Sequence, residues 1–305
     1  MNGRAKTDSG VLLCSLPRPA VIVTLTTDFG LRDGYVAAMK GAMLAVAPDV
    51  RLVDVTHEIP AQDVMAAGFV LRQAAPHFPE GTVHLAVVDP GVGTSRRGIA
   101  ARVRLGDRTH LFVGPDNGLL PLLLGDDEAE LVVVLDRPDA WATRTPSDTF
   151  HGRDIFGPVA AALAAGAGLR DLGTEADALT PMHWPLPRRD EQGIDGMVIH
   201  IDRFGNCVTN ICQEDVEEFA GGRGFKCYVG SAVIQRHAST YGHTSPGDPL
   251  TLFGSSGFFE VAVNGGNAAA LLSVERGASV NLLFEGSALV SPASEPTSSL
   301  IEGTA

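Results

Sequence analysis

Two aspartates stand directly after apolar, strand-like runs and directly before glycine-containing turns. Asp28 follows the run 21–27, and Asp89 follows the run 82–88. In an open parallel sheet, ligands bind beyond the carboxyl ends of the strands, and a nearby glycine lets the backbone approach a bound molecule closely. Either aspartate alone could simply cap a turn. Two of them at the same sheet edge favour a site that binds or activates a polar ligand.

A histidine precedes the alanine-rich segment that closes this half of the chain. His151 lies in the sequence TFHGRD, residues 149–154, and a helix is predicted over 154–165. The dipole at a helix N-terminus disfavours a protonated imidazole, so His151 could serve as a neutral base. The other histidines that we considered are interpreted as structural: His57, His77, His84, His110, His200, His237 and His243.

Polar loops in the C-terminal part of the chain offer further binding groups. Asp202 and Asn206 lie in the segment 201–210, which interrupts a strand pattern, and Ser255 lies in the Gly-Ser-Ser-Gly segment 254–257. Such loops could be plain hairpin connections. Their content of Asn, Asp and Ser also suits hydrogen bonding to a base or an amino-acid headgroup. Asn117, in the turn 114–118, could likewise line a pocket or merely form the turn.

Familiar nucleotide and metal motifs are incomplete in this sequence. The Asp-Phe-Gly at Asp28 has no kinase catalytic loop with it, and the glycines after Asp89 lack the Gly-Lys-Ser/Thr of a phosphate-binding loop. A formal net charge of −13 and a pI near 5.0 oppose binding to a phosphate backbone. The four cysteines form no CxxC pair and no zinc-like Cys/His spacing. We therefore expect neither a nucleic acid nor a metal as a partner.

The elements that must position these residues alternate along the first half of the chain. Strands are predicted at 21–27, 51–55, 82–88, 98–104, 110–113 and 131–135, and helices at 35–47, 63–74 and 154–165. The second helix has Gln62 or Asp63 as its predicted N-cap. Strands that alternate with helices predict an α/β domain, over residues 20–180, with a mostly parallel sheet covered on both faces.

A change of composition near residue 180 predicts a second domain. Three prolines within residues 181–187 and a charged stretch after them indicate a linker over 181–193. Strands are then predicted at 193–202, 225–229, 250–253, 258–263 and 279–284, with one helix at 214–219. This pattern favours a small antiparallel β-barrel over 194–290. Residues 1–19 are expected to be a loose extension, and 291–305 a disordered tail.

Two general properties bear on where the protein works. No apolar run approaches the roughly 20 residues that span a bilayer, so we expect no membrane partner. The cysteine pattern is typical of thiols in a reducing compartment, and we expect a cytoplasmic protein.

Six motifs in order resemble one known family, the S-adenosyl-L-methionine hydroxide adenosyltransferases. The motifs are TTDFG-x-x-D, VVDPGVGT-x-R, VGPDNGLL, TFHGRD, HIDRFGN-x-x-TNI and SSG-x-x-E-x-A-x-N, spread over roughly residues 20–290. Members are hydrolytic relatives of the fluorinase and chlorinase. The resemblance implies an α/β domain followed by a β-barrel, a homotrimer with its sites between subunits, and attack of water on the 5′ carbon of S-adenosylmethionine. The products would be adenosine and methionine.

The resemblance also assigns roles to the residues singled out above. It places a catalytic trio on Asp89, Arg96 and His151, in which the base is Asp89 or His151 and Arg96 holds the carboxylate. The remaining matches bind substrate: Asp28 the ribose, Asn206 the adenine, and Asp33, Asp202 and Ser255 the methionine part. S-adenosylmethionine is the substrate, and no cofactor is expected because the sulfonium is already an activated leaving group.

Three alternatives compete with a hydrolase. A halogenase of the same superfamily is disfavoured, because that branch lacks the trio and carries an aromatic wedge near the position of Gln62 and, in the fluorinase, a serine near Gly152. A protein that binds S-adenosylmethionine or adenosine without turnover would need only the pocket residues. A metal-dependent hydrolase built on Asp28, Asp89 and His151 is disfavoured by their motif context.

Overall fold

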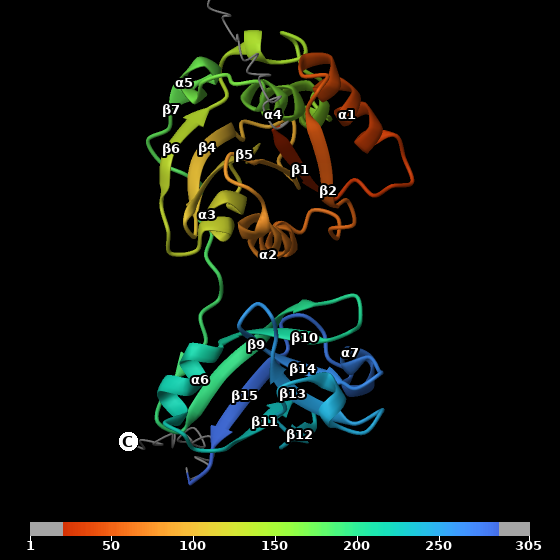
Figure 1. Cartoon of the computed structure of the whole chain (residues 1–305), viewed down its shortest axis with the longest axis vertical. Coiled ribbons are helices and arrows are strands. Elements are labelled where there is room, and N and C mark those ends of the chain that lie inside the picture. The colour runs from red at the N-terminus through yellow and green to blue at the C-terminus, as the bar shows by residue number, and fades with distance from the viewer. Residues whose placement is uncertain (1–20, 287–305) are drawn as a thin grey trace, which may run out of the picture. The chain divides into compact units, whose positions relative to one another are not determined.

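A seven-stranded sheet with helices on both faces forms the N-terminal part of the protein (Figure 1). The computed structural model describes residues 21–286, so the predicted extension 1–19 and tail 291–305 lie outside the described residues. The chain divides between His183 and Trp184 into two compact units. The predicted fold class, an α/β unit followed by an antiparallel barrel, is confirmed.

The sheet of the first unit is mixed, with order β2-β1-β3-β5-β4-β6-β7. Five strands run in one direction, and β4 and β7 run in the other. The strands are β1 (Ile22–Thr27), β2 (Arg51–Thr56), β3 (Val83–Val87), β4 (Gly98–Leu105), β5 (Arg108–Pro115), β6 (Ala129–Val134) and β7 (Thr174–Glu175).

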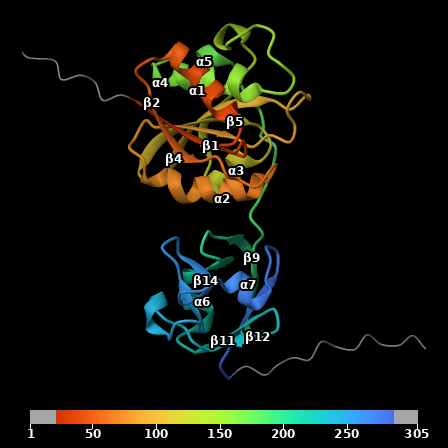
Figure 2. The ribbon, with the colours of Figure 1, turned by 90° about the vertical axis from the view of Figure 1, so that its right-hand side faces the viewer.

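The helices of this unit cover the sheet from two sides. Figures 1 and 2 show α1, α4 and α5 on one face and α2 and α3 on the other. Their bounds are α1 (Tyr35–Val46), α2 (Val64–Ala74), α3 (Leu119–Leu124), α4 (Gly157–Ala164) and α5 (Leu169–Leu172). Asp63 is the N-cap of α2, because its side chain accepts a hydrogen bond from the backbone of Ala66. The α3 helix is a short addition that the sequence pattern does not predict.

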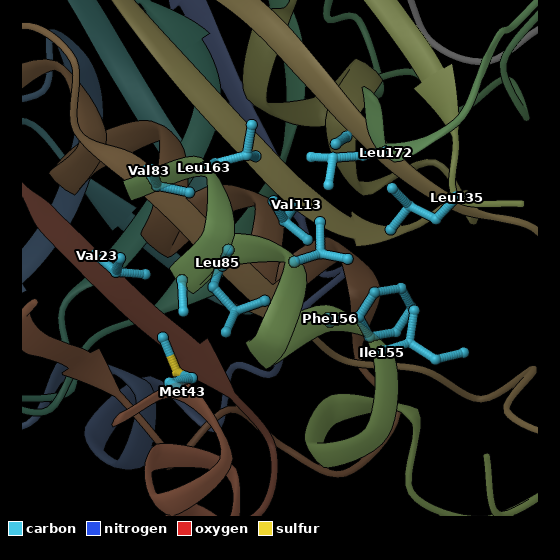
Figure 3. Close-up of a cluster of buried hydrophobic side chains, with 14 of the residues drawn as sticks. Val23, Met43, Val83, Leu85, Val113, Leu135, Ile155, Phe156, Leu163 and Leu172 are labelled. Carbon is cyan, nitrogen blue, oxygen red and sulfur yellow. The ribbon is translucent and has the colours of Figure 1, made fainter. Parts of the chain in front are cut away.

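A hydrophobic core lies between the sheet and the α1/α4 layer. Strand residues such as Val23 and Leu85 pack there against Met43 of α1 and Phe156 (Figure 3). Phe156 ends a π-helical turn, Gly152–Phe156, that runs directly into α4. The predicted helix 154–165 is therefore corrected at its start, because the chain enters it through one wider turn.

The second unit is an eight-stranded antiparallel sheet with order β12-β11-β15-β9-β10-β14-β13, and β8 pairs with β9. Residues 236–238, just after β12, hydrogen-bond to Thr251 of β13 and so bring the two ends of the sheet together. The elements are β8 (Arg188–Arg189), β9 (Gly193–Ile201), β10 (Cys207–Cys212), α6 (Gln213–Ala220), β11 (Phe225–Val229), β12 (Ala232–Ile234), β13 (Pro249–Phe253), β14 (Phe258–Val263), α7 (Ala268–Leu272) and β15 (Ser279–Phe284).

The β10 strand corrects the prediction that 201–210 is one polar loop. Only the part before Cys207 is a loop. Thr209 and Asn210 are polar but buried. Their burial is tolerated because each side chain forms a hydrogen bond with a backbone group of a neighbouring segment. Thr209 donates to the carbonyl of Phe259 at 2.8 Å, and Asn210 accepts from the amide of Met197 at 2.7 Å. Satisfied in this way, polar side chains fit inside a barrel strand.

Candidate active site

Adjacent parallel strands bring Asp28 and Asp89 to one edge of the sheet. β1 and β3 pair with Thr27 opposite Val87, so the residues that follow both strands emerge side by side. Both aspartates line a cavity of about 150 Å³. The other lining residues include Gln62, His151 and Gly152. The structure thus brings together two strand-end carboxylates and the imidazole that come from distant parts of the chain.

Asp89 is held by an arginine from the loop that follows it. Arg96 donates from Nε to Oδ1 of Asp89 at 3.0 Å and from Nη2 to Oδ2. The two side chains are 6% and 9% exposed, so water screens this ion pair little. Gly93 allows the loop its path, because it has φ +75° and a Cβ there would overlap the carbonyl oxygen of Asp148.

The same arginine also contacts His151. Nη2 of Arg96 lies 3.0 Å from Nδ1 of His151. A guanidinium has only donors, so Nδ1 is the acceptor and a neutral ring carries its hydrogen on Nε2. Burial lowers the pKa of His151, and the charge of Arg96 lowers this pKa further. Burial raises the pKa of Asp89, and Arg96 offsets that rise only in part. The ion pair with Arg96 favours the ionised carboxylate of Asp89, and the lowered pKa of His151 leaves its imidazole neutral at neutral pH.

The π-helical turn after His151 is anchored by a buried carboxylate. Asp154 is 3% exposed and accepts two hydrogen bonds from Arg153, at 2.6 and 2.9 Å. It also accepts one from the backbone amide of Ser147 at 2.9 Å. The bond from Ser147 joins the start of the helix to the loop that precedes His151. Single π turns often occur at functional sites, where they redirect one side chain.

Asp28 is oriented by a residue with an unusual backbone. The amide of Gln62 donates to Oδ2 of Asp28 at 2.8 Å. Gln62 has φ +66°, a left-handed conformation that costs a non-glycine residue energy. Asp33 is exposed in the loop before α1 and is not among the residues that line the cavity.

Beside this cavity lies a wider hollow with aromatic walls. It has a volume of about 590 Å³ and is lined by Asp28, Phe29, Tyr35, Phe150 and other residues. The rings of Phe29, Tyr35 and Phe150 pack with centroids 5.3 to 6.2 Å apart. A hollow that joins a carboxylate to aromatic faces suits a ligand with both hydroxyl groups and an apolar part.

Asn117 supports the sheet edge and is not among the residues lining the 150 Å³ cavity. Its side-chain amide donates to the carbonyl of Val88 at 2.8 Å, and its side-chain oxygen accepts from Leu119 at 3.4 Å. Because Val88 directly precedes Asp89, this bond holds the strand end from which the carboxylate projects.

Asp202 and Asn206 lie together in the second unit, where they line a cavity of about 530 Å³. The Asp202 carboxylate closes the loop by accepting from the amides of Phe204 at 2.9 Å and Asn206 at 2.8 Å. It also accepts from the side-chain nitrogen of Asn206 at 2.9 Å. Ser255 is exposed in the turn between β13 and β14 and is not among this cavity's lining residues.

Two aromatic residues of this second cavity escaped the sequence analysis. Phe204 is 73% exposed and Tyr241 is 39% exposed, and both line the cavity beside Asn206. Exposed rings beside a few polar side chains are typical of sites that bind planar groups. Tyr241 stands alone among polar residues in the segment 239–245. That isolated aromatic residue is the one signal that could have pointed to it.

The described residues hold neither a metal-binding cluster nor a membrane-spanning helix. Within residues 21–286, no group of three His, Cys, Asp or Glu side chains is arranged to hold a metal ion. In the same range, no helix is both long and apolar enough to cross a bilayer.

Known proteins match the chain over most of its length. The SAM hydroxide adenosyltransferase N-terminal domain model matches residues 23–173, and the C-terminal domain model matches residues 196–281. The (R)-S-adenosyl-L-methionine hydrolase of Salinispora arenicola is 44% identical over 260 residues, which are 84% of this chain and 95% of that protein. A fluorinase of Actinopolyspora mzabensis is 26% identical over 296 residues, 88% of this chain and 98% of that protein.

A solved structure also matches most of the chain. The crystal structure of an uncharacterized conserved protein from Thermotoga maritima matches with a TM-score of 0.79 and 33% identity. The match covers 86% of this chain and 100% of the other.

Proposed function

The chain belongs to the SAM hydroxide adenosyltransferase family, and we propose that it hydrolyses (R)-S-adenosyl-L-methionine to adenosine and L-methionine. The observation that carries the proposal is the contact of Asp89, Arg96 and His151 beside a cavity at the sheet edge. In the reaction, water oxygen bonds to the 5′ carbon and the carbon–sulfur bond breaks. The electron pair of the carbon–sulfur bond goes to sulfur, so methionine leaves as a neutral thioether. One proton of the attacking water is released.

Asp89 is the proton acceptor in this proposal, and His151 orients the water. Because Arg96 occupies Nδ1, the ring of His151 presents Nε2–H, which is a hydrogen-bond donor. Asp89 is ionised at neutral pH, and burial raises its pKa towards a value better suited to a base. Arg96 holds both groups and stabilises the negative charge that develops on the water oxygen.

The substrate contacts follow the assignments made above. Asp28 lines both hollows of the first unit, which supports its role with the ribose hydroxyls. Asn206 would contact the adenine, and its place beside two exposed aromatic rings supports that role. Asp33, Asp202 and Ser255 would contact the methionine part, while Asn117 would act through the strand end.

The assembly is part of the proposal as well. We propose a cytoplasmic homotrimer, in which the barrel of one subunit completes the site of its neighbour. A monomeric form would then be inactive, and sedimentation of active and inactive fractions tests this.

The reaction as proposed uses no metal and no cofactor. A sulfonium leaves as a neutral thioether, so no Lewis acid is needed to stabilise the leaving group. Water, a weak nucleophile, gains from deprotonation and from being held in line with the breaking bond. Full activity in excess chelator is the expected result, and activity restored only by an added metal would contradict it.

A halogenase is the alternative enzyme, and two observations favour the hydrolase over it. The hydrolase of Salinispora arenicola is 44% identical to this chain and the fluorinase 26%. The cavity is lined by Gln62 and Gly152, where the halogenating branch carries an aromatic residue and, in the fluorinase, a serine.

Chromatography of purified protein with S-adenosylmethionine, with and without chloride and fluoride, tests the function. Adenosine and methionine in equal amounts, independent of halide, are expected. A halogenated adenosine would support the halogenase. Ligand that stays bound and unchanged would instead indicate a binding protein without turnover.

A further inference from the structure

A buried carboxylate lies on an apolar face of the barrel. Glu260 sits in the middle of β14 and is 8% exposed. Its strand partners are Val208 of β10 and Leu252 of β13. Leu250, Leu252 and Ala262 form a small hydrophobic cluster in this part of the barrel. Burying a carboxylate there is unfavourable unless hydrogen bonds compensate, so its presence calls for a specific partner.

The backbone around Glu260 leaves room for the carboxylate. Gly254, at the end of β13, lies so near that a Cβ would overlap Oε1 of Glu260. Any side chain at position 254 would displace the carboxylate. The absence of a side chain at Gly254 therefore leaves the space that the Glu260 carboxylate occupies.

The partner of Glu260 is the hydroxyl of Tyr241. Tyr241 Oη donates to Oε2 of Glu260 at 2.9 Å. Burial and the nearby carboxylate raise the pKa of Tyr241 to about 12, so the hydroxyl keeps its proton and remains a donor. Burial raises the pKa of Glu260, and the hydrogen bond from Tyr241 offsets part of that rise because it favours the ionised carboxylate.

The ring of Tyr241 lies on a segment that has little regular structure of its own. Within residues 235–248, the regular elements are the single β-bridge of His237 with Thr251 and the 3-10 turn Tyr241–His243. Arg236 donates to the carbonyl of His243 at 2.7 Å, and Asn264 donates to the carbonyl of Thr244 at 2.7 Å. These bonds fix the backbone, whereas the bond to Glu260 fixes the ring, which lines the same cavity as Asn206.

We propose that Glu260 is a positioning residue, whose carboxylate holds the Tyr241 ring as a wall of the barrel cavity against which the adenine of the substrate packs. The identity of the planar group rests on the proposed function. Glu260 does not touch the reacting atoms. It therefore governs how tightly the substrate binds and leaves the chemical step unchanged.

Steady-state kinetics of the full chain separate binding from chemistry. Tyr241→Phe removes only the hydroxyl, and Glu260→Ala removes the acceptor. In each variant KM should rise about tenfold with kcat within about twofold of the unmodified protein, as expected for loss of one charge-assisted hydrogen bond. The double variant should show the same rise as either single variant, because both changes remove the same bond. Glu260→Gln keeps an acceptor and should restore most of the affinity.

A matched control removes another buried hydrogen bond of the same barrel. Thr209→Val deletes the bond to the carbonyl of Phe259, the residue beside Glu260. It should lower thermal stability and leave KM unchanged. Multiplied KM effects in the double variant, or an equal rise of KM in Thr209→Val, would overturn the positioning role.

Calorimetric binding of adenosine keeps this proposal separate from the proposed function. Weaker adenosine binding in Tyr241→Phe and Glu260→Ala, again without additivity, supports the positioning role even where no S-adenosylmethionine is hydrolysed. Unchanged adenosine affinity in both variants overturns the role, even in a fully active hydrolase.

Discussion

Arg96 and His151 are joined by a 3.0 Å contact from Nη2 to Nδ1, although 55 positions separate them in the chain. The same nitrogen of Arg96 also bonds to Asp89. One guanidinium therefore sets both the rotation of the imidazole and the place of the carboxylate. The ring nitrogen that does not contact Arg96 is Nε2, which carries the hydrogen of the neutral ring.

Asp89→Asn should reduce kcat about 10²- to 10⁴-fold, because the amide keeps the shape of the side chain but cannot accept a proton. KM should change little. Steady-state kinetics with S-adenosylmethionine give both values. Asp139→Asn is the matched control, since Asp139 pairs with Arg144 in an ion pair that is 80% exposed on both sides and contributes little. An Asp89→Asn variant as fast as the control would refute the assigned base.

The pH profile should have an acidic limb set by Asp89. Burial raises the pKa of Asp89, so kcat/KM should fall on acidification around a midpoint above the ordinary value of 3.8. Burial and Arg96 lower the pKa of His151 below its ordinary value of 6.5, so its ring is neutral at neutral pH. Rates between pH 4 and pH 9 check this. A profile that instead required a protonated imidazole would contradict the assignment.

Arg96→Lys should be nearly as harmful as loss of the base, with kcat lowered about 10²- to 10³-fold. A lysine ammonium is a single point of donation and cannot hold two carboxylate oxygens and Nδ1 together. Arg144→Lys, in the exposed ion pair with Asp139, makes the same chemical change away from the site and should leave kcat unchanged. Comparable rates for the two variants would mean that fork geometry is unimportant.

Asp154 should act through shape more than charge. Asp154→Asn retains an acceptor for the Ser147 amide and should keep kcat within about threefold, whereas Asp154→Ala should lose about tenfold or more as His151 shifts. KM and thermal stability are measured alongside kcat. Equal loss in both variants, in proportion to stability, would show a purely structural role.

Acid should destabilise the first unit through a buried histidine. His84 is fully buried, with Nδ1 2.8 Å from Thr24 Oγ1 and Nε2 3.1 Å from His110 Nδ1. Burial lowers the pKa of His84 from 6.5 to about 3. Between these two values the unfolded chain binds a proton that the folded protein does not. The free energy of unfolding therefore falls as pH drops from 6.5 towards 3.

His84→Gln should flatten that dependence, by at most about 1.4 kcal/mol per pH unit. Urea unfolding at several pH values measures the slope, and His183→Gln, at an exposed histidine, is the control. Identical slopes in the two variants would show that His84 does not couple folding to protons.

Much of this architecture is legible in the sequence. Mostly apolar strands such as β3 (Val83–Val87) are fully buried, so their composition indicates them directly. The β10 strand was missed because Thr209 and Asn210 are polar, and only partners distant in the chain satisfy them. The α3 helix has only six residues, too few for a periodic pattern.

Some features of the candidate site could likewise be predicted from the sequence, and one could not. Asp28 and Asp89 could be expected at one sheet edge, since parallel strands place their carboxyl ends together. The family predicted from six ordered motifs is confirmed by both domain models. The pairing of Tyr241 with Glu260 could not be predicted, because it depends on the path of an irregular segment over β14.

The bonds between residues 236–238 and Thr251 have a consequence for solubility. An open sheet ends in strands whose free amides and carbonyls can recruit a strand from another molecule, which is how many β-rich proteins begin to aggregate. Here β12 and β13 stand at the two ends of the strand order, and the segment just after one bonds to the other. Backbone groups at the two ends of this sheet are thus paired within the barrel itself, and they are not available to a strand of another molecule.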